Sequence, residues 1–247
     1  MHDLAARHEA DDRSIAARVA ALDWPAIGTA LDADGYAVIG PLLTEAECAR
    51  LSAGFDADTN FRNRVVMARH GYGQGEYRYY SYPLPPLIES LRTALYPRLA
   101  EVANCWEQAL GRPPAFPADH AAYLTRCHAA GQTRPTPLLL RYGVGDYNRL
   151  HQDLYGDLCF PLQVAFLLNR PGADFTGGEF LLTEQRPRMQ VRAEVVPLAR
   201  GQGVVFAVNQ RPVPGTRGMF RVAMRHGVSR IRTGHRHTLG IIFHDAK

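Results

Sequence analysis

Residues 141–153 read RYGVGDYNRLHQD and directly follow an apolar run, Leu138–Leu140. Near the end of this stretch His151 and Asp153 are two residues apart, so their side chains point to the same side of an extended segment. An imidazole and a carboxylate in that arrangement can bind one metal ion. A second histidine from elsewhere in the chain would complete the two histidines and one carboxylate of non-haem Fe(II) sites, which leave coordination positions open.

Downstream of Leu138 the sequence is typical of an all-β region. Short apolar segments alternate with turns that contain Gly and Pro, which predicts an antiparallel sandwich or barrel. The expected strands are Leu138–Tyr142, Phe160–Asn169, Gly178–Thr183, Glu194–Leu198, Gly203–Val208, Phe220–Met224 and His237–Phe243.

The first half of the chain mainly predicts helices. Apolar residues in Ser14–Leu31 recur at helical spacing, with an interruption at Pro25. Thr44–Glu47 is a capping-box sequence, which predicts a helix that ends near Phe55. The other expected elements are helices at Pro86–Leu110 and Asp119–Ala130 and a short strand at Tyr36–Ile39. The chain as a whole therefore predicts an α+β fold, in which helices buttress one face of a β core.

Residues 61–83 are rich in Arg, Gly and Tyr, and the glycines argue against a helix. We expect a hairpin or a mobile flap. Its tyrosines and arginines would either stack on bases or grip a peptide, or else form an amphipathic cover on the core. No clear linker divides the chain. Residues 1–135 are expected to form helical support with this flap, and residues 136–247 the catalytic β core, packed as one compact unit.

Composition narrows the class of protein. The chain has 247 residues, of which 46% are hydrophobic, enough for a sizeable core. No apolar run approaches the roughly 18 residues of a membrane span. Met1–Arg18 is polar, so we expect a mobile tail leading into a helix rather than a secretory signal. The four cysteines are scattered, which argues against a zinc ribbon or a disulfide scaffold and favours a reducing cytoplasm.

The net charge of +4 is unevenly distributed. Residues 1–60 carry eleven acidic residues and four arginines, whereas residues 186–237 carry eleven arginines and one acid, Glu194. Such a basic block suits an anionic partner, including nucleic acid. Coding bias is the alternative explanation, because Lys247 is the single lysine among 28 basic residues.

His226 is the preferred second histidine of the metal site. Arg236 follows it by ten residues at the start of the last expected strand, and Thr238 shares the face of Arg236 by the two-residue period. His235 and His237 fall on the opposite face. The other histidines lie in the expected tail or flap, on a helix or near the chain end: His2, His8, His70, His120, His128 and His244.

Arg236 suits an anionic co-substrate. Its planar guanidinium pairs with a carboxylate through two hydrogen bonds, and an arginine buried in a small barrel without an anion would be costly. Tyr142, which faces inward with Leu138 and Leu140, is placed to donate its hydroxyl to the same ligand. A dicarboxylate that chelates iron at one end would be anchored by Arg236 at the other.

Together, His151-x-Asp153, His226 and Arg236 resemble the signature of the 2-oxoglutarate/Fe(II)-dependent dioxygenase superfamily. Residues 141–153 resemble the pre-metal stretch of its nucleic-acid alkylation-repair branch, the AlkB family, which has a similar R-Y, a Gly three residues after the Tyr, and L-H-Q-D. The tyrosine of that branch binds 2-oxoglutarate, a role that the resemblance carries to Tyr142.

Other features resemble the prolyl-hydroxylase-like branch, namely the ten-residue step from His226 to Arg236 and residues 177–180 and 234–239. The alkylation-repair enzymes have a longer step and a second arginine on the last strand, whereas Ile242–Asp245 contains none. The resemblance covers about Leu138–Ala246, with looser similarity at Tyr36–Leu51. It is greatest to a bacterial group of dioxygenases inferred to act on nucleic acid.

The resemblance implies a double-stranded β-helix, or jelly roll, and an oxidoreductase that hydroxylates or oxidatively demethylates a substrate with release of succinate and carbon dioxide. It implies molecular oxygen as a further substrate and 2-oxoglutarate as co-substrate. The implied ligands of Fe(II) are His151, Asp153 and His226, and the implied 2-oxoglutarate-binding residues are Arg236, Tyr142 and Thr238.

The substrate stays open between alkylated nucleic acid, which residues 141–153 and the arginine block favour, and a protein, peptide or small molecule, which the His226–Arg236 step favours. Two further classes of protein remain as alternatives. One is a metal- or anion-binding sensor module on the same fold. The other is a zinc hydrolase, although the chain lacks an H-E-x-x-H helix. The oligomeric state is not predicted.

Overall fold

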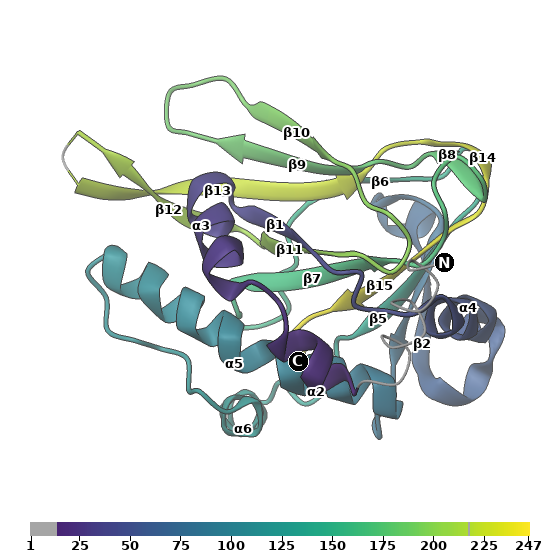
Figure 1. Cartoon of the computed structure of the whole chain (residues 1–247), viewed down its shortest axis with the longest axis horizontal. Helices are drawn as coiled ribbons and strands as arrows, with labels where there is room; N and C mark the ends of the chain where they lie inside the picture. The colour runs from purple at the N-terminus through teal and green to yellow at the C-terminus, as the bar shows by residue number, and fades with distance from the viewer. Residues whose placement is uncertain (1–13, 217) are drawn as a thin grey trace, which may run out of the picture.

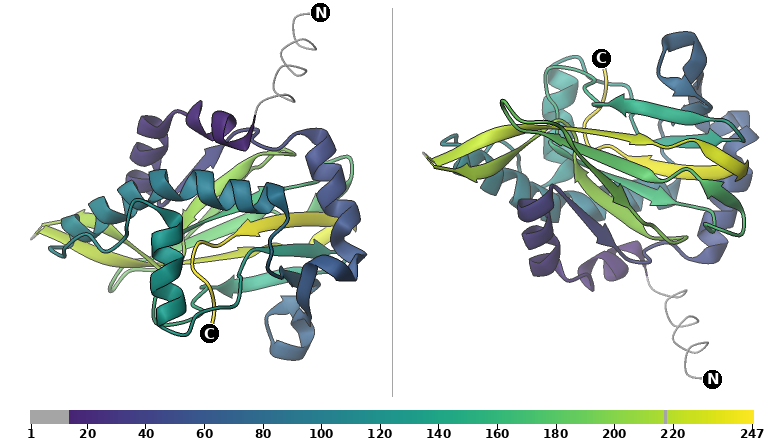
Figure 2. Two further views of the ribbon diagram at one scale, coloured as in Figure 1. Left: turned by 90° about the horizontal axis from the view of Figure 1, so that it is seen from below. Right: turned by 90° about the horizontal axis from the view of Figure 1, so that it is seen from above.

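The computed structural model describes residues 14–216 and 218–247, so most of the predicted N-terminal tail lies outside the described residues. Two sheets face each other at its centre, a larger one of seven strands and a smaller one of six (Figure 1). The helices lie against the outer side and the edges of the larger sheet, whereas no described helix covers the outer side of the smaller sheet (Figure 2). The predicted α+β fold with a jelly-roll core is confirmed.

The helices begin and end close to the predicted positions. They are α2 (Ile15–Ala20), α3 (Trp24–Asp34), α4 (Glu45–Ala53), α5 (Pro86–Ala109) and α6 (His120–Ala129), with 3-10 turns η1 (Gly54–Asp56), η2 (Asp58–Asn60) and η3 (Met67–His70). Pro25 lies in the first turn of α3, where its missing N–H has no helical partner to lose. Thr44 and Glu47 form the predicted capping box. None of these helices is long and apolar enough to cross a membrane.

The larger sheet backs the cavity described below. Its strands, in spatial order, are β1 (Tyr36–Ile39), β11 (Gly203–Ala207), β7 (Leu162–Leu167), β15 (Arg236–Ile241), β5 (Leu138–Tyr142), β4 (Glu76–Tyr80) and β2 (Phe61–Val66). Those of the smaller sheet are β10 (Arg192–Val196), β9 (Phe180–Gln185), β13 (Gly218–Val228), β6 (Tyr147–His151) and β3 (Gly73–Gln74), with β12 (Gln210–Gly215) also paired to β13. A two-stranded ribbon joins β8 (Phe175–Gly177) and β14 (Ile231–Gly234).

Every predicted strand overlaps an observed one, but β6, β8, β12 and β14 were not predicted. As a result, His151 does not follow the strand at Leu138–Tyr142 through a loop; it ends the separate strand β6. The segment 61–83 contains a hairpin, in which β2 pairs with β4 and β4 extends the larger sheet beside β5. The region before residue 135 therefore contributes strands as well as helices to the sheet that carries Arg236.

A buried ion pair fastens the end of the chain to helix α5. The guanidinium of Arg92 contacts Asp245 at 2.7 Å, and both side chains are fully buried. The hydroxyl of Tyr82 and the ring of His128 complete the contacts of the Asp245 carboxylate. Burial alone would raise the pKa of Asp245, but Arg92 and these hydrogen bonds outweigh it and lower the pKa. The pair thus holds the segment that follows β15 against α5.

Replacing Asp245 with Asn should lower the free energy of unfolding by about 3–5 kcal/mol at pH 7, because Arg92 stays buried without its counter-charge. Urea unfolding measures the loss. The control Asp157→Asn removes an exposed ion pair with Lys247 and should cost less than about 1 kcal/mol. Folding lowers the pKa of Asp245, so its charge stabilises the protein above about pH 4 and this stability is lost as the pH falls further. A deficit that does not shrink in acid would contradict this account.

Candidate active site

A cavity of about 330 Å³ lies between the two sheets. Strands β5, β7 and β15 of the larger sheet form one wall of the cavity, and strands β6, β9 and β13 of the smaller sheet form the opposite wall. All six residues that the sequence singled out line this one cavity, although they come from segments up to about 100 residues apart: Tyr142, His151, Asp153, His226, Arg236 and Thr238.

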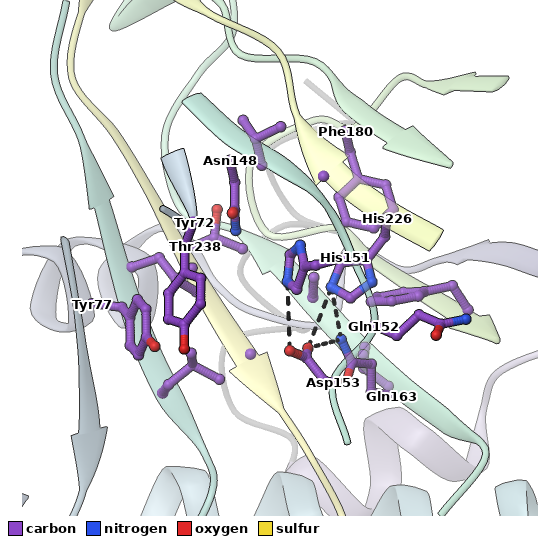
Figure 3. A pocket seen from close by; sticks show the side chains of 18 of the residues that line it. Tyr72, Tyr77, Asn148, His151, Gln152, Asp153, Gln163, Phe180, His226 and Thr238 are labelled. Atoms are coloured by element: carbon purple, nitrogen blue, oxygen red, sulfur yellow. Dashed lines mark hydrogen bonds and ion pairs between the residues drawn. The ribbon is translucent and has the colours of Figure 1, made fainter. Parts of the chain in front are cut away.

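His151, Asp153 and His226 converge on one point of this cavity (Figure 3). One ligand atom from each lies within 4.8 Å of the others. The Nε2 atom of His151 is 3.5 Å from Oδ1 of Asp153, and Nε2 of His226 is 3.3 Å from Oδ2. Two imidazole nitrogens and a carboxylate on one side of a cavity are the donor set of a non-haem Fe(II) site, which leaves the other side free.

The pairing of β6 with β13 places the two histidines opposite each other, since His226 and His151 are register partners. The next partners are Val228 and Asn148, so two residues along β13 match three along β6. This β-bulge turns both Asn148 and His151 toward the cavity, although residues three apart in a regular strand face opposite sides.

Two glycines flank the bulge. A Cβ atom on Gly227 would lie 2.8 Å from the carbonyl oxygen of Asn148, and one on Gly73 would lie 2.3 Å from that of Tyr147. Both clashes are with backbone, which cannot rotate away. The absence of side chains at these two positions therefore lets β3 and β13 approach the bulged strand closely enough to position His151.

The orientation of His151 is fixed by its own strand. Its Nδ1 lies 2.7 Å from the carbonyl oxygen of Arg149. A proton on Nδ1 donates to that oxygen. Nε2 faces Asp153: it donates to that carboxylate when the ring is protonated and offers a lone pair to a metal ion when the ring is neutral. Metal-binding histidines are commonly oriented by such a backbone contact.

Two residues that the sequence analysis missed hold the Asp153 carboxylate. Tyr155 donates its hydroxyl to Oδ1 at 2.7 Å, and Gln163 donates its amide to Oδ2 at 2.9 Å. Burial by itself would raise the pKa of Asp153, but hydrogen bonds and charge from His151 and His226 hold it well below its usual range. The carboxylate is thus negative and oriented over the whole neutral range. A lone Gln within the apolar run of β7 was the available signal for Gln163.

Arg236 is buried at the start of β15 with about 1% of its surface exposed. It donates to Thr238, and its Nε atom has no partner among the described residues. No described carboxylate lies within ion-pair distance, and burial lowers the pKa of Arg236 to about 10. The guanidinium faces Tyr142, whose ring lies 5.7 Å away and whose buried hydroxyl has no partner within hydrogen-bond distance in the described part of the chain. A buried cation without a counter-charge favours an anion at this end of the cavity.

The predicted division of the last strand is observed. Arg236 and Thr238 line the cavity, whereas His235 and His237 line a separate hollow on the other side of the sheet. His237 there contacts the side chain of Asn169. Neither histidine joins the converging donors, which leaves His226 as the partner of His151.

Replacing Asp153 with Ala should reduce the affinity for Mn(II), a stand-in for Fe(II), by more than about 100-fold, because it removes the negatively charged donor. Loss of a residue that only hydrogen-bonds a metal ligand typically reduces metal affinity about 10- to 100-fold. Isothermal titration calorimetry measures the affinity. Asp157→Asn, four residues away and exposed, is the matched control and should bind the metal normally. Unchanged affinity in the Asp153 variant would remove these residues from the metal site.

Comparison with known proteins gives the family. The family model Oxygenase-NA, described as an "oxygenase, catalysing oxidative methylation of damaged DNA", matches residues 75–246. Uncharacterized proteins of two Mycobacterium tuberculosis strains are each 52% identical to this chain over 164 residues, which span 66% of this chain and 70% of theirs.

Solved structures agree on the fold. A Pseudomonas putida prolyl-4-hydroxylase superposes with a TM-score of 0.51 at 15% identity, covering 91% of this chain and 99% of the other. A prolyl 4-hydroxylase from Phytophthora capsici gives 0.51 at 16% identity, covering 92% and 62%. At such low identity the likeness concerns the jelly roll alone. The family match and the three converging donors are more specific: the chain belongs to the Oxygenase-NA family of the 2-oxoglutarate/Fe(II) oxygenase superfamily, and it is an oxidoreductase.

Proposed function

We propose that this protein is an Fe(II)- and 2-oxoglutarate-dependent dioxygenase that hydroxylates or oxidatively demethylates alkylated nucleic acid. The observation that carries the proposal is the pairing of two features in one cavity. A metal-type donor set, His151, Asp153 and His226, shares the space with Arg236, a buried cation that has no carboxylate partner among the described residues. A metal enzyme without an acidic co-substrate would have no use for such an arginine.

The donor set fits Fe(II). The Nε2 atoms of His151 and His226 and the carboxylate of Asp153 would hold the ion on one face, with Tyr155 and Gln163 keeping the carboxylate in place. Iron and 2-oxoglutarate together supply the oxidising chemistry, in which oxygen converts 2-oxoglutarate to succinate and carbon dioxide and delivers one oxygen atom to a substrate C–H bond.

The larger sheet would bind the far end of 2-oxoglutarate. Arg236 pairs with a carboxylate in the two-pronged geometry of a guanidinium, and Thr238, two residues along the same face, steadies that guanidinium. Tyr142 is the register partner of Arg236 on β5, and its unpartnered hydroxyl is available to the same carboxylate. The protein's part is thus to neutralise, orient and enclose the co-substrate.

Alkylated nucleic acid is the substrate that the family description supports. The arginine-rich region 186–237 agrees with it, and the free cysteines are compatible with a reaction in the cytoplasm. Hydroxylation of a peptide or a small molecule is the second candidate, favoured by the ten-residue step from His226 to Arg236.

Arg236→Met should raise the KM for 2-oxoglutarate by at least about 30-fold, because loss of a buried charge partner costs 2 kcal/mol or more. Succinate formation at varied 2-oxoglutarate measures it. Affinity for Mn(II) should stay unchanged, which separates this role from metal binding. Arg236→Lys should rescue only in part, since an ammonium cannot form the paired hydrogen bonds. A normal KM for 2-oxoglutarate in Arg236→Met would show that Arg236 does not bind the co-substrate.

A substrate panel read by Fe(II)-dependent succinate release distinguishes the two candidates. Methylated single-stranded oligonucleotides should stimulate release above the rate without substrate, and proline-containing peptides and small metabolites should not. Mass spectrometry of the oligonucleotide should show a loss of methyl groups or a gain of oxygen. Stimulation by peptides alone would favour the second candidate.

A further inference from the structure

The bulge in β6 has an outward consequence as well as an inward one. Because it turns Asn148 and His151 toward the cavity, the two residues between them, Arg149 and Leu150, are both exposed on the outer face of the smaller sheet. The backbone N–H of Arg149 donates to the carbonyl oxygen of Tyr72, which lines the cavity. The exposed arginine therefore lies at the rim of the active-site cavity.

A second arginine shares this face. Arg225 precedes the inward-facing His226 on β13, so its side chain points outward and is exposed. Gly227 lies opposite the bulge that contains Arg149, and Arg225 is two residues before Gly227 on the same strand. By strand geometry, the backbones of Arg225 and Arg149 are therefore about 8 Å apart. Neither side chain has a hydrogen bond or an ion pair with any described residue.

The strands next to these arginines add no opposing charge. The outward positions on β9 and β10 that align with Arg225 and Gly227 are uncharged: Leu181, Thr183, Ala193 and Val195. No described helix covers this side (Figure 2). Two cations beside these uncharged positions, with no ion pair to any described residue, attract an anionic chain.

Aromatic and apolar residues surround the cavity on the same side. Tyr72 is 50% exposed and stacks on His70 with 5.3 Å between ring centroids, and Leu150 and Leu154 are 44% and 50% exposed. Apart from Asp153, no cavity-lining residue is acidic. A nucleic-acid strand has both flat bases that can stack and charged phosphates, so it matches this surface better than an acidic peptide, which has charge but no rings to stack.

We propose that Arg149 and Arg225 are phosphate contacts that hold a single strand of nucleic acid along the outer face of β13 and β6. The nucleotide to be oxidised then lies at the rim beside Tyr72. This inference rests on the proposed function and specifies how the substrate is held. A single strand suits this surface better than a duplex, because its target base is already unpaired and can enter the cavity.

The test is fluorescence anisotropy with the whole chain and a short labelled single-stranded oligonucleotide at increasing salt. The double variant Arg149→Ala/Arg225→Ala should bind about fivefold more weakly at 0.1 M salt. The slope of log affinity against log salt should become shallower by about 1.4, since each phosphate contact in single strands contributes about 0.7. Arg149→Lys/Arg225→Lys should restore both values, because charge rather than shape makes the contact.

The matched control is Arg50→Ala/Arg98→Ala, which removes two exposed arginines from α4 and α5 and should leave affinity and slope unchanged. An unchanged slope in the Arg149/Arg225 variant, or an equal change in the control, would overturn the proposal. So would equal binding of polyglutamate with the same loss on mutation. Succinate release by the wild-type protein tests the proposed function separately, so that either idea can fail alone.

Discussion

The antiparallel pairing of β6 with β13 is the interaction on which the site depends. It joins segments about 75 residues apart in the chain and makes His151 and His226 direct partners. Asp153 then reaches both imidazoles from the loop that follows β6. A shift of one residue in this register would turn His226 or His151 to the solvent side, because side chains alternate along a strand. The metal-type donor set is therefore a property of strand pairing, more than of the three-residue motif.

The cavity combines two charges that are buried in different ways. Asp153 is surrounded by donors, so it is already compensated by protein groups. Arg236 is compensated by little more than Thr238 and the face of Tyr142. Since an unpaired buried cation is costly, the proposed function supplies the missing partner of Arg236 in the form of a ligand carboxylate. Under the proposed function, this asymmetry would place the metal at one end of the cavity and the co-substrate at the other.

Much of this was accessible from the sequence. Two-residue periodicity put Arg236 and Thr238 on one face and His237 on the other, and alternating apolar segments gave the main strands. For two of the missed strands there is a physical reason. β12 contains Pro212 and Pro214, which are unusual in strands, and here it forms a ribbon with β13. β6 shows no alternation because its bulge exposes two consecutive residues.

The sequence analysis also missed two residues that contact the Asp153 carboxylate, for a different reason. Gln163 touches Asp153 only after the two sheets have packed, so no local pattern marks it as a partner of the carboxylate. Tyr155 is only two residues from Asp153, but it lies in an irregular loop where no repeating pattern tells which way a side chain points. The capping box at Thr44 and Glu47, in contrast, was visible because it is entirely local. Local contacts that follow a known motif were predictable, whereas the contact in the irregular loop and the contact across the sandwich needed the fold.

The bulge also separates two kinds of evolutionary change within four residues, 148–151. Side chains at 149 and 150 face outward, while Asn148 and His151 are held inward by a backbone distortion that rests on Gly73 and Gly227. Substitutions at the two outward positions leave the packing around His151 untouched. The outer surface of β6 is therefore free to vary in evolution without disturbing the donor set, provided that the two glycines are retained.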